Sequence, residues 1–208
     1  MLENNYSFNG LKERHHDLGN FYQFLEGFSK EELLRIEKDV ESLELEMGKT
    51  GDGENSNEDG GNVRNSRVKW IPQNDDWKWL YEKLGGMILE ANRELWNFNL
   101  YNMPEQIQYT EYDASYNGKY EWHMDVGAGD NARRKVSVTV QLSDEHEYEG
   151  GDLEFFTGGE MNEREFKKGQ KRAGTVYIFP SYMLHRVAPV TKGLRKSFVL
   201  WVGGTPYK

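Results

Sequence analysis

Residues 135–142, KVSVTVQL, decide the fold, because apolar and small polar side chains alternate along this stretch. Successive side chains of a β-strand point to opposite faces of its sheet. One face carries the aliphatic residues Val136, Val138, Val140 and Leu142. The other face carries Ser137, Thr139 and Gln141. We therefore predict a strand whose aliphatic face packs on a helix and whose polar face lines a cavity.

Four further segments beyond Pro104 show short apolar runs with the same period of two, separated by Gly-rich or charged turns. They are residues 107–112, 152–156, 175–179 and 197–202. Many short strands joined by such turns are typical of an all-β sandwich or barrel. We expect a mainly β fold with flanking helices.

A first helix is predicted near the N-terminus. Ser29 and Glu32 form an S-x-x-E capping box, which marks the start of a helix over residues from about 30 to 45. The stretch that follows, GKTGDGENSNEDGGNVRNS, is polar and rich in glycine, so residues 48–66 are interpreted as a long loop or a lid.

A second helix is predicted between the loop and the strands. After an Asn-Asp-Asp start at Asn74, apolar residues recur at helical spacing from Trp77 to Trp96. We expect this stripe to pack on the sheet. Gly85 and Gly86 weaken a helix, so they mark either a close helix–sheet approach or a bend.

Composition excludes several classes of function. At 208 residues the chain is long enough for one domain with a sizeable core. Its net charge of -9 provides no general attraction for nucleic acid or anionic lipid, so we expect neither as a partner. The chain has no cysteine, so any metal must be held by histidine and carboxylate side chains. Without a signal-like N-terminus or a long apolar run, we expect a soluble, cytoplasmic protein, whose oligomeric state the sequence does not predict.

Three residues have the pattern of a metal site. His123 and Asp125 lie two apart in YEWHMDV, an extended segment on which their side chains would share a face. His185, in FPSYMLHRVAPV, would join them from a neighbouring strand. Two histidines and one carboxylate suit non-haem Fe(II), because they leave three coordination positions open. The remaining histidines, His15, His16 and His146, are interpreted as solvated surface residues.

An arginine and a serine follow the third histidine. Arg195 and Ser197 also lie two apart, so on a strand they would face the same way. A guanidinium matches a carboxylate with two parallel hydrogen bonds, and the hydroxyl adds another donor. The pair predicts an anion clamp beside the metal.

Two alternative functions stay open. The first is a cupin-like hydrolase or isomerase that uses zinc or manganese, but this function leaves the clamp unexplained. The second is a jelly-roll binding module without catalysis, but such a module would usually have lost a metal ligand.

With these residues in place, residues 107–203 resemble the catalytic domain of prolyl 4-hydroxylase-like 2-oxoglutarate/Fe(II) oxygenases, and most closely the PKHD-type hydroxylases. The matching motifs occur in the family's order: QYTEYDASYNGKYEWHMD, VSVTVQLSD, YEGGDLEFF and GTVYIFPSYMLHRVAPVTKGLRKSFVLWV. The resemblance extends upstream through SRVKWIP and EANRELWNFNL. We therefore expect an oxygenase domain over residues 63–208, with its β core at about 105–203. Residues 1–62 would form an N-terminal helical extension and polar loop.

The resemblance implies a double-stranded β-helix, or jelly roll, with a defined set of site residues. His123, Asp125 and His185 would bind Fe(II), and Arg195 with Ser197 would hold the distal carboxylate of 2-oxoglutarate. The residues implied to assist at the co-substrate are Tyr112, with Tyr120 as the next match, Gln141, which stands where some relatives have tyrosine, and Leu153. Phe155 and Phe156 are expected in the core.

The resemblance also implies the chemistry. Such an enzyme uses O2 to hydroxylate an unactivated C–H bond while 2-oxoglutarate is converted to succinate and CO2, with L-ascorbate a further candidate cofactor. Asp125 is intact, which favours hydroxylation over halogenation. Peptidyl proline is the leading substrate by resemblance, followed by a free amino acid or another small metabolite. The residues expected at the rim, where substrate is selected, are Trp70, Tyr116, Trp122, Tyr182 and the 127–135 loop with Arg133 and Arg134.

Overall fold

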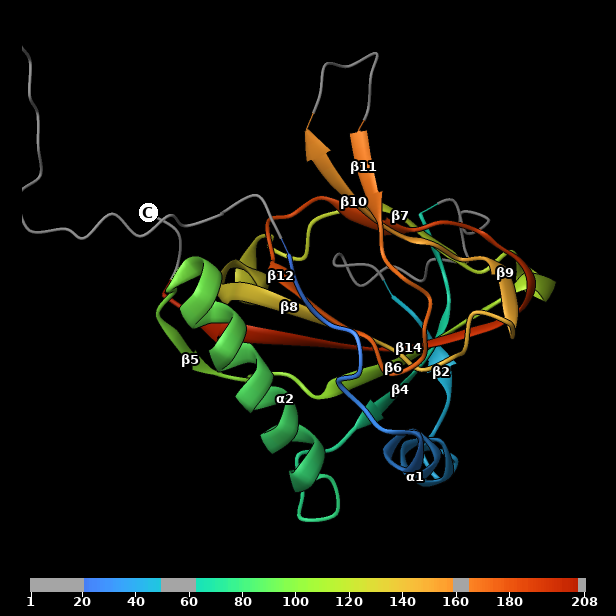
Figure 1. The fold of residues 1–208 in the computed structure, drawn as a ribbon, viewed down its shortest axis with the longest axis horizontal. Coiled ribbons are helices and arrows are strands. Elements are labelled where there is room, and N and C mark those ends of the chain that lie inside the picture. The colour runs from blue at the N-terminus through green and yellow to red at the C-terminus, as the bar shows by residue number, and fades with distance from the viewer. Residues whose placement is uncertain (1–20, 50–62, 159–164, 206–208) are drawn as a thin grey trace, which may run out of the picture.

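The computed structural model describes residues 21–49, 63–158 and 165–205, and within them two antiparallel sheets form the body of the fold (Figure 1). The larger sheet has the order β1 (Tyr22–Phe24), β12 (Val176–Pro180), β8 (Arg134–Gln141), β14 (Val190–Gly204), β6 (Ile107–Asp113), β4 (Arg67–Ile71) and β2 (Glu46–Met47). Two short strands, β5 (Leu100–Asn102) and β9 (Tyr148–Gly150), also pair with β14. The smaller sheet has the order β11 (Glu165–Lys168), β10 (Leu153–Gly158), β13 (His185–Val187), β7 (Lys119–His123) and β3 (Arg64–Asn65).

The alternation in β8 works as the sequence predicts. Val136, Val138 and Val140 belong to an apolar cluster that also contains the buried face of a long helix, α2 (Lys78–Ala91). Figure 1 shows α2 lying along one face of the larger sheet. The opposite face of the sheet turns toward the smaller sheet. Burial of the aliphatic face in this core is the main favourable term that holds the helix to the sheet.

The helix α1 (Lys30–Val40) begins at the predicted capping box. Ser29 Oγ accepts from the backbone of Glu32, and the Glu32 side chain accepts from the backbone of Ser29. The expected extension to residue 45 is wrong, because the helix ends at Val40. Ser42 Oγ donates to the carbonyl of Asp39, and this side-chain bond replaces the next helical turn and lets the chain turn toward β2.

The helix α2 begins later than its polar start, with Asn74 Oδ1 accepting from the backbone of Trp77. Its last turn widens into a π-helix over Asn92–Trp96, where the buried Asn92 side chain bonds the backbone N–H and carbonyl of Phe98. A close approach to the sheet does not explain Gly86, because a Cβ there would meet nothing within 4 Å. Within the described residues, no helix is long and apolar enough to cross a bilayer.

The remaining elements complete the frame around a cavity. Short 3-10 turns at Ala114–Tyr116 and Gly129–Arg133 precede β7 and β8. Strands β10 and β11 project beyond the body as a hairpin arm (Figure 1). A second apolar cluster, which includes Tyr112, Phe155 and Phe179, fills the space between the two sheets. The part of that space that the apolar cluster leaves open is a cavity.

Candidate metal centre and anion clamp

A cavity of about 460 Å³ lies between the two sheets, and both sheets supply its lining. The two histidines come from the smaller sheet, His123 from β7 and His185 from β13. Arg195 and Ser197 come from β14 of the larger sheet. The histidines and the clamp therefore face the same cavity from opposite sheets, an arrangement that only the folded chain creates.

The three predicted ligands converge. His123 and His185 are directly paired in the register of β7 and β13. One ligand atom from each of His123, Asp125 and His185 lies within 4.8 Å of the others, so the group could hold one metal ion. The expectation that Asp125 shares a strand with His123 is wrong, because β7 ends at His123. Asp125 is held beyond the strand end by its backbone N–H, which donates to the carbonyl of Ser181 at 2.9 Å.

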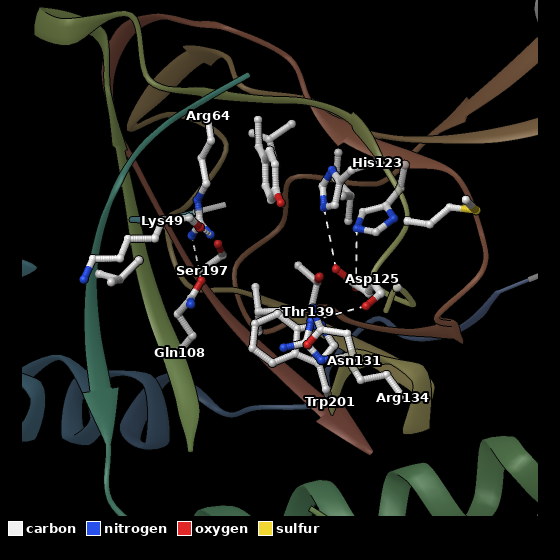
Figure 2. Close-up of a pocket in the computed structure, with 18 of the residues that line it drawn as sticks. Lys49, Arg64, Gln108, His123, Asp125, Asn131, Arg134, Thr139, Ser197 and Trp201 are labelled. Carbon is white, nitrogen blue, oxygen red and sulfur yellow. Dashed lines mark hydrogen bonds and ion pairs between the residues drawn. The ribbon is translucent and has the colours of Figure 1, made fainter. Parts of the chain in front are cut away.

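Hydrogen bonds on the far side of each ring orient the two imidazoles. Nδ1 of His123 lies 2.7 Å from the carbonyl of Glu121, and Nδ1 of His185 lies 2.9 Å from the carbonyl of Met183. A carbonyl can only accept, so each Nδ1 carries the proton and each Nε2 keeps its lone pair. Both Nε2 atoms turn to Asp125, at 3.6 Å from its carboxylate oxygens (Figure 2). This tautomer is the one that binds a metal through Nε2.

The electrostatics of the cluster favour the same protonation state. Burial, with help from the neighbouring His185, lowers the pKa of His123 to about 3. Burial raises the pKa of Asp125, but the neighbouring histidines, a hydrogen bond with Ser137 and the charge of Arg134 together hold this pKa below its usual value, so the carboxyl is ionised at neutral pH. A neutral imidazole beside a carboxylate is a competent ligand set.

One carboxylate oxygen of Asp125 tests whether the cluster fits a metal ion. It is 7% exposed, and its Oδ2 has no hydrogen-bond partner among the described residues. A buried carboxylate oxygen without a partner is unfavourable unless a cation binds it. The residues present therefore fit a divalent ion that prefers nitrogen and oxygen ligands, as Fe(II) does.

Arg195 is fully buried and has no carboxylate partner in the described chain. Its Nη1 donates to Ser197 Oγ at 3.1 Å and its Nη2 to Gln141 Oε1 at 2.8 Å, while Nε has no partner among the described residues. Neutral partners orient a guanidinium without neutralising it. A buried, unneutralised arginine that lines a cavity is suited to an anionic ligand.

The other predicted pocket residues lie around the clamp and the metal ligands. Tyr112 and Leu153 line the cavity, and the Arg195 guanidinium lies 5.4 Å from the Tyr112 ring centre. Tyr120 also lines the cavity and stacks on His123, with 3.5 Å between ring centres. Burial raises the pKa of Tyr120 to about 12, so it is a neutral phenol. Gln141 is the hydrogen-bond acceptor that orients Arg195.

The predicted rim residues divide into two groups. Trp70 lines the cavity, whereas Tyr116, Trp122 and Tyr182 lie outside its described lining. In the 127–135 loop the cavity residues are Gly127, Ala128, Asn131 and Arg134, but not Arg133. Of the loop or lid expected over residues 48–66, residues 50–62 lie outside the described residues, and Arg64–Asn65 form strand β3 instead of a loop.

Arg134 supports the metal ligands from behind. It ion-pairs with Glu105 and donates to the backbone carbonyl of Asp125 at 3.3 Å. Its guanidinium also lies 3.9 Å from the centre of the Trp201 ring. Of the two phenylalanines expected in the core, Phe155 is fully buried and Phe156 is half-buried.

Sequence reasoning missed one wall of the cavity. Lys49, Arg64 and Gln108 line it beside the clamp, and Trp201 lines it near Asp125 (Figure 2). Trp201 could have been found, because on β14 it lies on the same side as Arg195 and Ser197 by strand parity. Arg64 could not, because it precedes the matching segment SRVKWIP and belongs to no motif itself.

Comparison with known proteins identifies the segment that builds this site. Residues 107–203 match the model of the 2OG-Fe(II) oxygenase superfamily. A PKHD-type hydroxylase of Synechococcus sp. (strain CC9605) is 43% identical over 83 residues, which cover 40% of this chain and 36% of that protein. A PKHD-type hydroxylase of Idiomarina loihiensis is 35% identical over 100 residues, covering 48% of this chain and 44% of that protein. The matched region thus spans less than half of these relatives' length.

Solved structures show the same fold at lower identity. A prolyl-4-hydroxylase of Pseudomonas putida matches with a TM-score of 0.65 and 17% identity, over 89% of this chain and 92% of that one. A prolyl hydroxylase of Trichoplax adhaerens, solved with a peptide fragment of the hypoxia inducible factor oxygen degradation domain, matches with a TM-score of 0.68 and 18% identity, over 89% and 84%. The predicted jelly-roll fold is confirmed.

Proposed function

We propose that this chain, whose residues 107–203 match the model of the 2OG-Fe(II) oxygenase superfamily, is an iron(II)- and 2-oxoglutarate-dependent dioxygenase. One observation carries the proposal. A buried cluster of two histidines and one aspartate shares a cavity with a fully buried arginine that has no carboxylate partner in the described chain. A metal-dependent hydrolase needs the first feature but has no use for the second.

The proposal assigns a role to each residue of the cluster and the clamp. His123, Asp125 and His185 hold Fe(II), and Arg195 with Ser197 holds the distal carboxylate of 2-oxoglutarate. When bound, iron and 2-oxoglutarate supply the oxidising chemistry, in which O2 hydroxylates a C–H bond and 2-oxoglutarate leaves as succinate and CO2. The clamp fixes the far end of the co-substrate, so that its other end meets the metal in one orientation.

The surrounding residues keep this geometry in place. The carbonyls of Glu121 and Met183 hold the proton on each Nδ1, so both histidines bind as neutral ligands. Arg134 holds the backbone carbonyl of Asp125. Two packed sheets enclose the clamp and exclude bulk water from it, which strengthens the arginine–carboxylate pair. Tyr120 remains protonated and can donate a hydrogen bond into the cavity.

Peptidyl proline is the substrate that we propose first. It rests on likeness, since the solved neighbours are prolyl hydroxylases, one of them bound to a peptide. Trp70 at the cavity edge offers an aromatic surface on which a proline ring could pack.

Anaerobic titration of the metal-free protein with Fe(II) and then 2-oxoglutarate tests the class. We expect a weak visible charge-transfer band when both are present, and succinate formation once O2 is admitted with L-ascorbate as reductant. Zn(II) in place of Fe(II) is the control, since it should occupy the ligands and give neither signal. Absence of both signals with Fe(II), together with hydrolysis supported by Zn(II), would favour the hydrolase alternative.

A further inference from the structure

A second buried arginine, Arg64, lines the same cavity and has no role in the proposed reaction so far. Arg64 lies on β3 and is 5% exposed. Its Nε donates to Ser66 Oγ at 2.8 Å, its Nη1 to the carbonyl of Lys49 at 3.0 Å and its Nη2 to Gln108 Oε1 at 2.7 Å. None of these partners is charged. Arg64 makes no ion pair with any carboxylate in the described chain.

The position of the guanidinium is built by its neighbours. Gly48 N donates to the carbonyl of Ser66 at 2.9 Å, which brings the chain against Arg64. A Cβ on Gly48 would collide with Ser66 Oγ and lie 2.9 Å from Arg64 Nε. A guanidinium has five N–H donors, and the three bonds above use three of them. Two donors remain for a ligand.

Among the described residues, no acidic side chain of the cavity pairs with Arg64. Among the lining residues, Arg134 pairs with Glu105, and the proposed function assigns Asp125 to the metal and Arg195 to 2-oxoglutarate. Glu46 also lines the cavity and carries one negative charge, but it accepts from Trp70 Nε1 at 2.6 Å and makes no ion pair with Arg64, so its charge offsets at most one of the two remaining cations. The remaining cations are buried Arg64 and exposed Lys49, in a chain whose net charge is -9. An unpaired buried charge is costly, so this end of the cavity favours an anionic ligand.

The location of Arg64 points to the substrate. The Tyr120 ring contacts the guanidinium, at 4.8 Å from its centre, and also stacks on the metal ligand His123. Arg64 and Lys49 therefore lie across the cavity from His123 and Asp125, one aromatic ring away from the metal position (Figure 2). A group held by Arg64 would be anchored close to the metal without occupying its coordination positions.

We infer that Arg64, with Lys49 at the rim, binds a carboxylate of the substrate, so that the enzyme selects substrates that carry a negative charge beside the oxidised carbon. The inference rests on the proposed function. A planar carboxylate matches the two donors that the guanidinium still presents. Two sources share this chemistry: an acidic residue next to proline in a peptide, or the carboxylate of a free amino acid.

Matched substrate pairs that differ by one carboxylate test the inference. The pairs are blocked proline peptides with Glu or Gln on either side of the proline, and L-proline with L-prolinamide. Succinate formation by the Fe(II)-loaded protein gives kcat/KM for each member. The wild type should favour the carboxylate member of at least one pair by about tenfold or more, because a charge-assisted hydrogen bond is lost with the amide. The pair that shows the preference identifies the source.

Variants then assign the preference to Arg64. Arg64→Gln should bring the ratio within the preferred pair close to one, and Arg64→Lys should keep part of it. Arg67→Gln is the matched control, since Arg67 lies on β4, the next strand along the chain, and is exposed outside the cavity lining, and it should keep the full ratio. Gln108→Glu places a carboxylate on the present partner of Arg64, and it should also abolish the preference. This second variant keeps the test valid if Arg64→Gln fails to fold.

Three results would overturn the inference. The first is that the wild type turns over no carboxylate member, or shows no preference for any of them. The second is that Arg64→Gln keeps the preference. The third is that Arg64→Gln weakens 2-oxoglutarate binding as severely as Arg195→Ala does. The last result would place Arg64 in the co-substrate site. Failure of the proposed function is recognised separately, because the wild type would then give no charge-transfer band with Fe(II) and 2-oxoglutarate.

Discussion

The two faces of β14 are both buried, but they differ in polarity and in what they contact. Toward α2, the strand presents Phe198, Leu200 and Val202, which are buried in an apolar cluster. Toward the smaller sheet, it presents Arg195, Ser197, Val199 and Trp201, which line the cavity. Strand parity alone separates the residues that hold the fold together from the residues that bind.

Burial of the apolar face stabilises the folded protein, whereas burial of the charged Arg195 on the polar face destabilises it. Each buried aliphatic side chain of the first face contributes roughly 1.5 to 3 kcal/mol through the hydrophobic effect. Arg195 on the other face is fully buried with neutral partners only in the described chain, which is unfavourable until an anion binds. Substitutions on the two faces should therefore affect different measurements.

Removal of a metal ligand should have the largest effect. Asp125→Ala should weaken Fe(II) binding by about 100-fold or more, since loss of a ligand's hydrogen-bond partner alone costs about 10- to 100-fold. Equilibrium titration with Fe(II) measures this. Asp130→Ala is the control, because Asp130 is an exposed acid of the neighbouring turn. Unchanged iron affinity in Asp125→Ala would remove Asp125 from the ligand set.

The clamp should separate co-substrate binding from metal binding. Arg195→Ala should weaken 2-oxoglutarate binding by about 100-fold or more, because a buried charge pair loses one partner, while iron affinity without 2-oxoglutarate changes much less. The intensity of the charge-transfer band against 2-oxoglutarate concentration measures it. Lys192→Ala, at an exposed lysine of the same strand, should change neither. An equal loss of iron and 2-oxoglutarate binding would mean that Arg195 is structural.

The opposite face should respond in stability. Leu200→Ala should lower the free energy of unfolding by about 2 to 5 kcal/mol, because it leaves a cavity in the core. Urea denaturation measures the loss, and 2-oxoglutarate affinity of the folded fraction should remain near that of the wild type. Leu200→Met, which nearly conserves volume, should cost less than about 1.5 kcal/mol. A large drop in 2-oxoglutarate affinity would show that the two faces are coupled.

The smallest effect is expected from the second member of the clamp. Ser197→Ala removes one hydrogen-bonding group beside Arg195, so 2-oxoglutarate affinity should fall by about fivefold, equivalent to about 1 kcal/mol. The same band titration measures it. Ser42→Ala, at an exposed serine in the loop between α1 and β2, is the control. If Ser197→Ala lowered 2-oxoglutarate affinity as much as Arg195→Ala does, Ser197 would be the residue that holds the Arg195 guanidinium in place.

Local patterns accounted for much of the fold and for part of the site. The alternation in β8 and the helical stripe of α2 both depend on near neighbours in the chain, and both were predicted. The shared side of Arg195 and Ser197 follows from strand parity for the same reason. His123 and His185 met as expected, because two strands of a sandwich bring distant residues into register.

Long-range contacts explain what the sequence did not predict. Asp125 leaves its strand where its backbone N–H donates to the carbonyl of Ser181, and the chain that follows α1 pairs β2 with β4. Arg64 reaches the cavity because β3 pairs with β7 and Gly48 packs against its guanidinium. None of these contacts leaves a period or a motif in the sequence.

The sequence by itself determined which residues could do chemistry and which face of each strand they occupy, because residue type and strand parity are local properties. Only the tertiary structure decided that two sheets would carry the ligands and the clamp to opposite walls of one cavity, and that a second unneutralised arginine would join them. Burial in a shared low-dielectric space gives these charges their strength, and such a space exists only between packed elements.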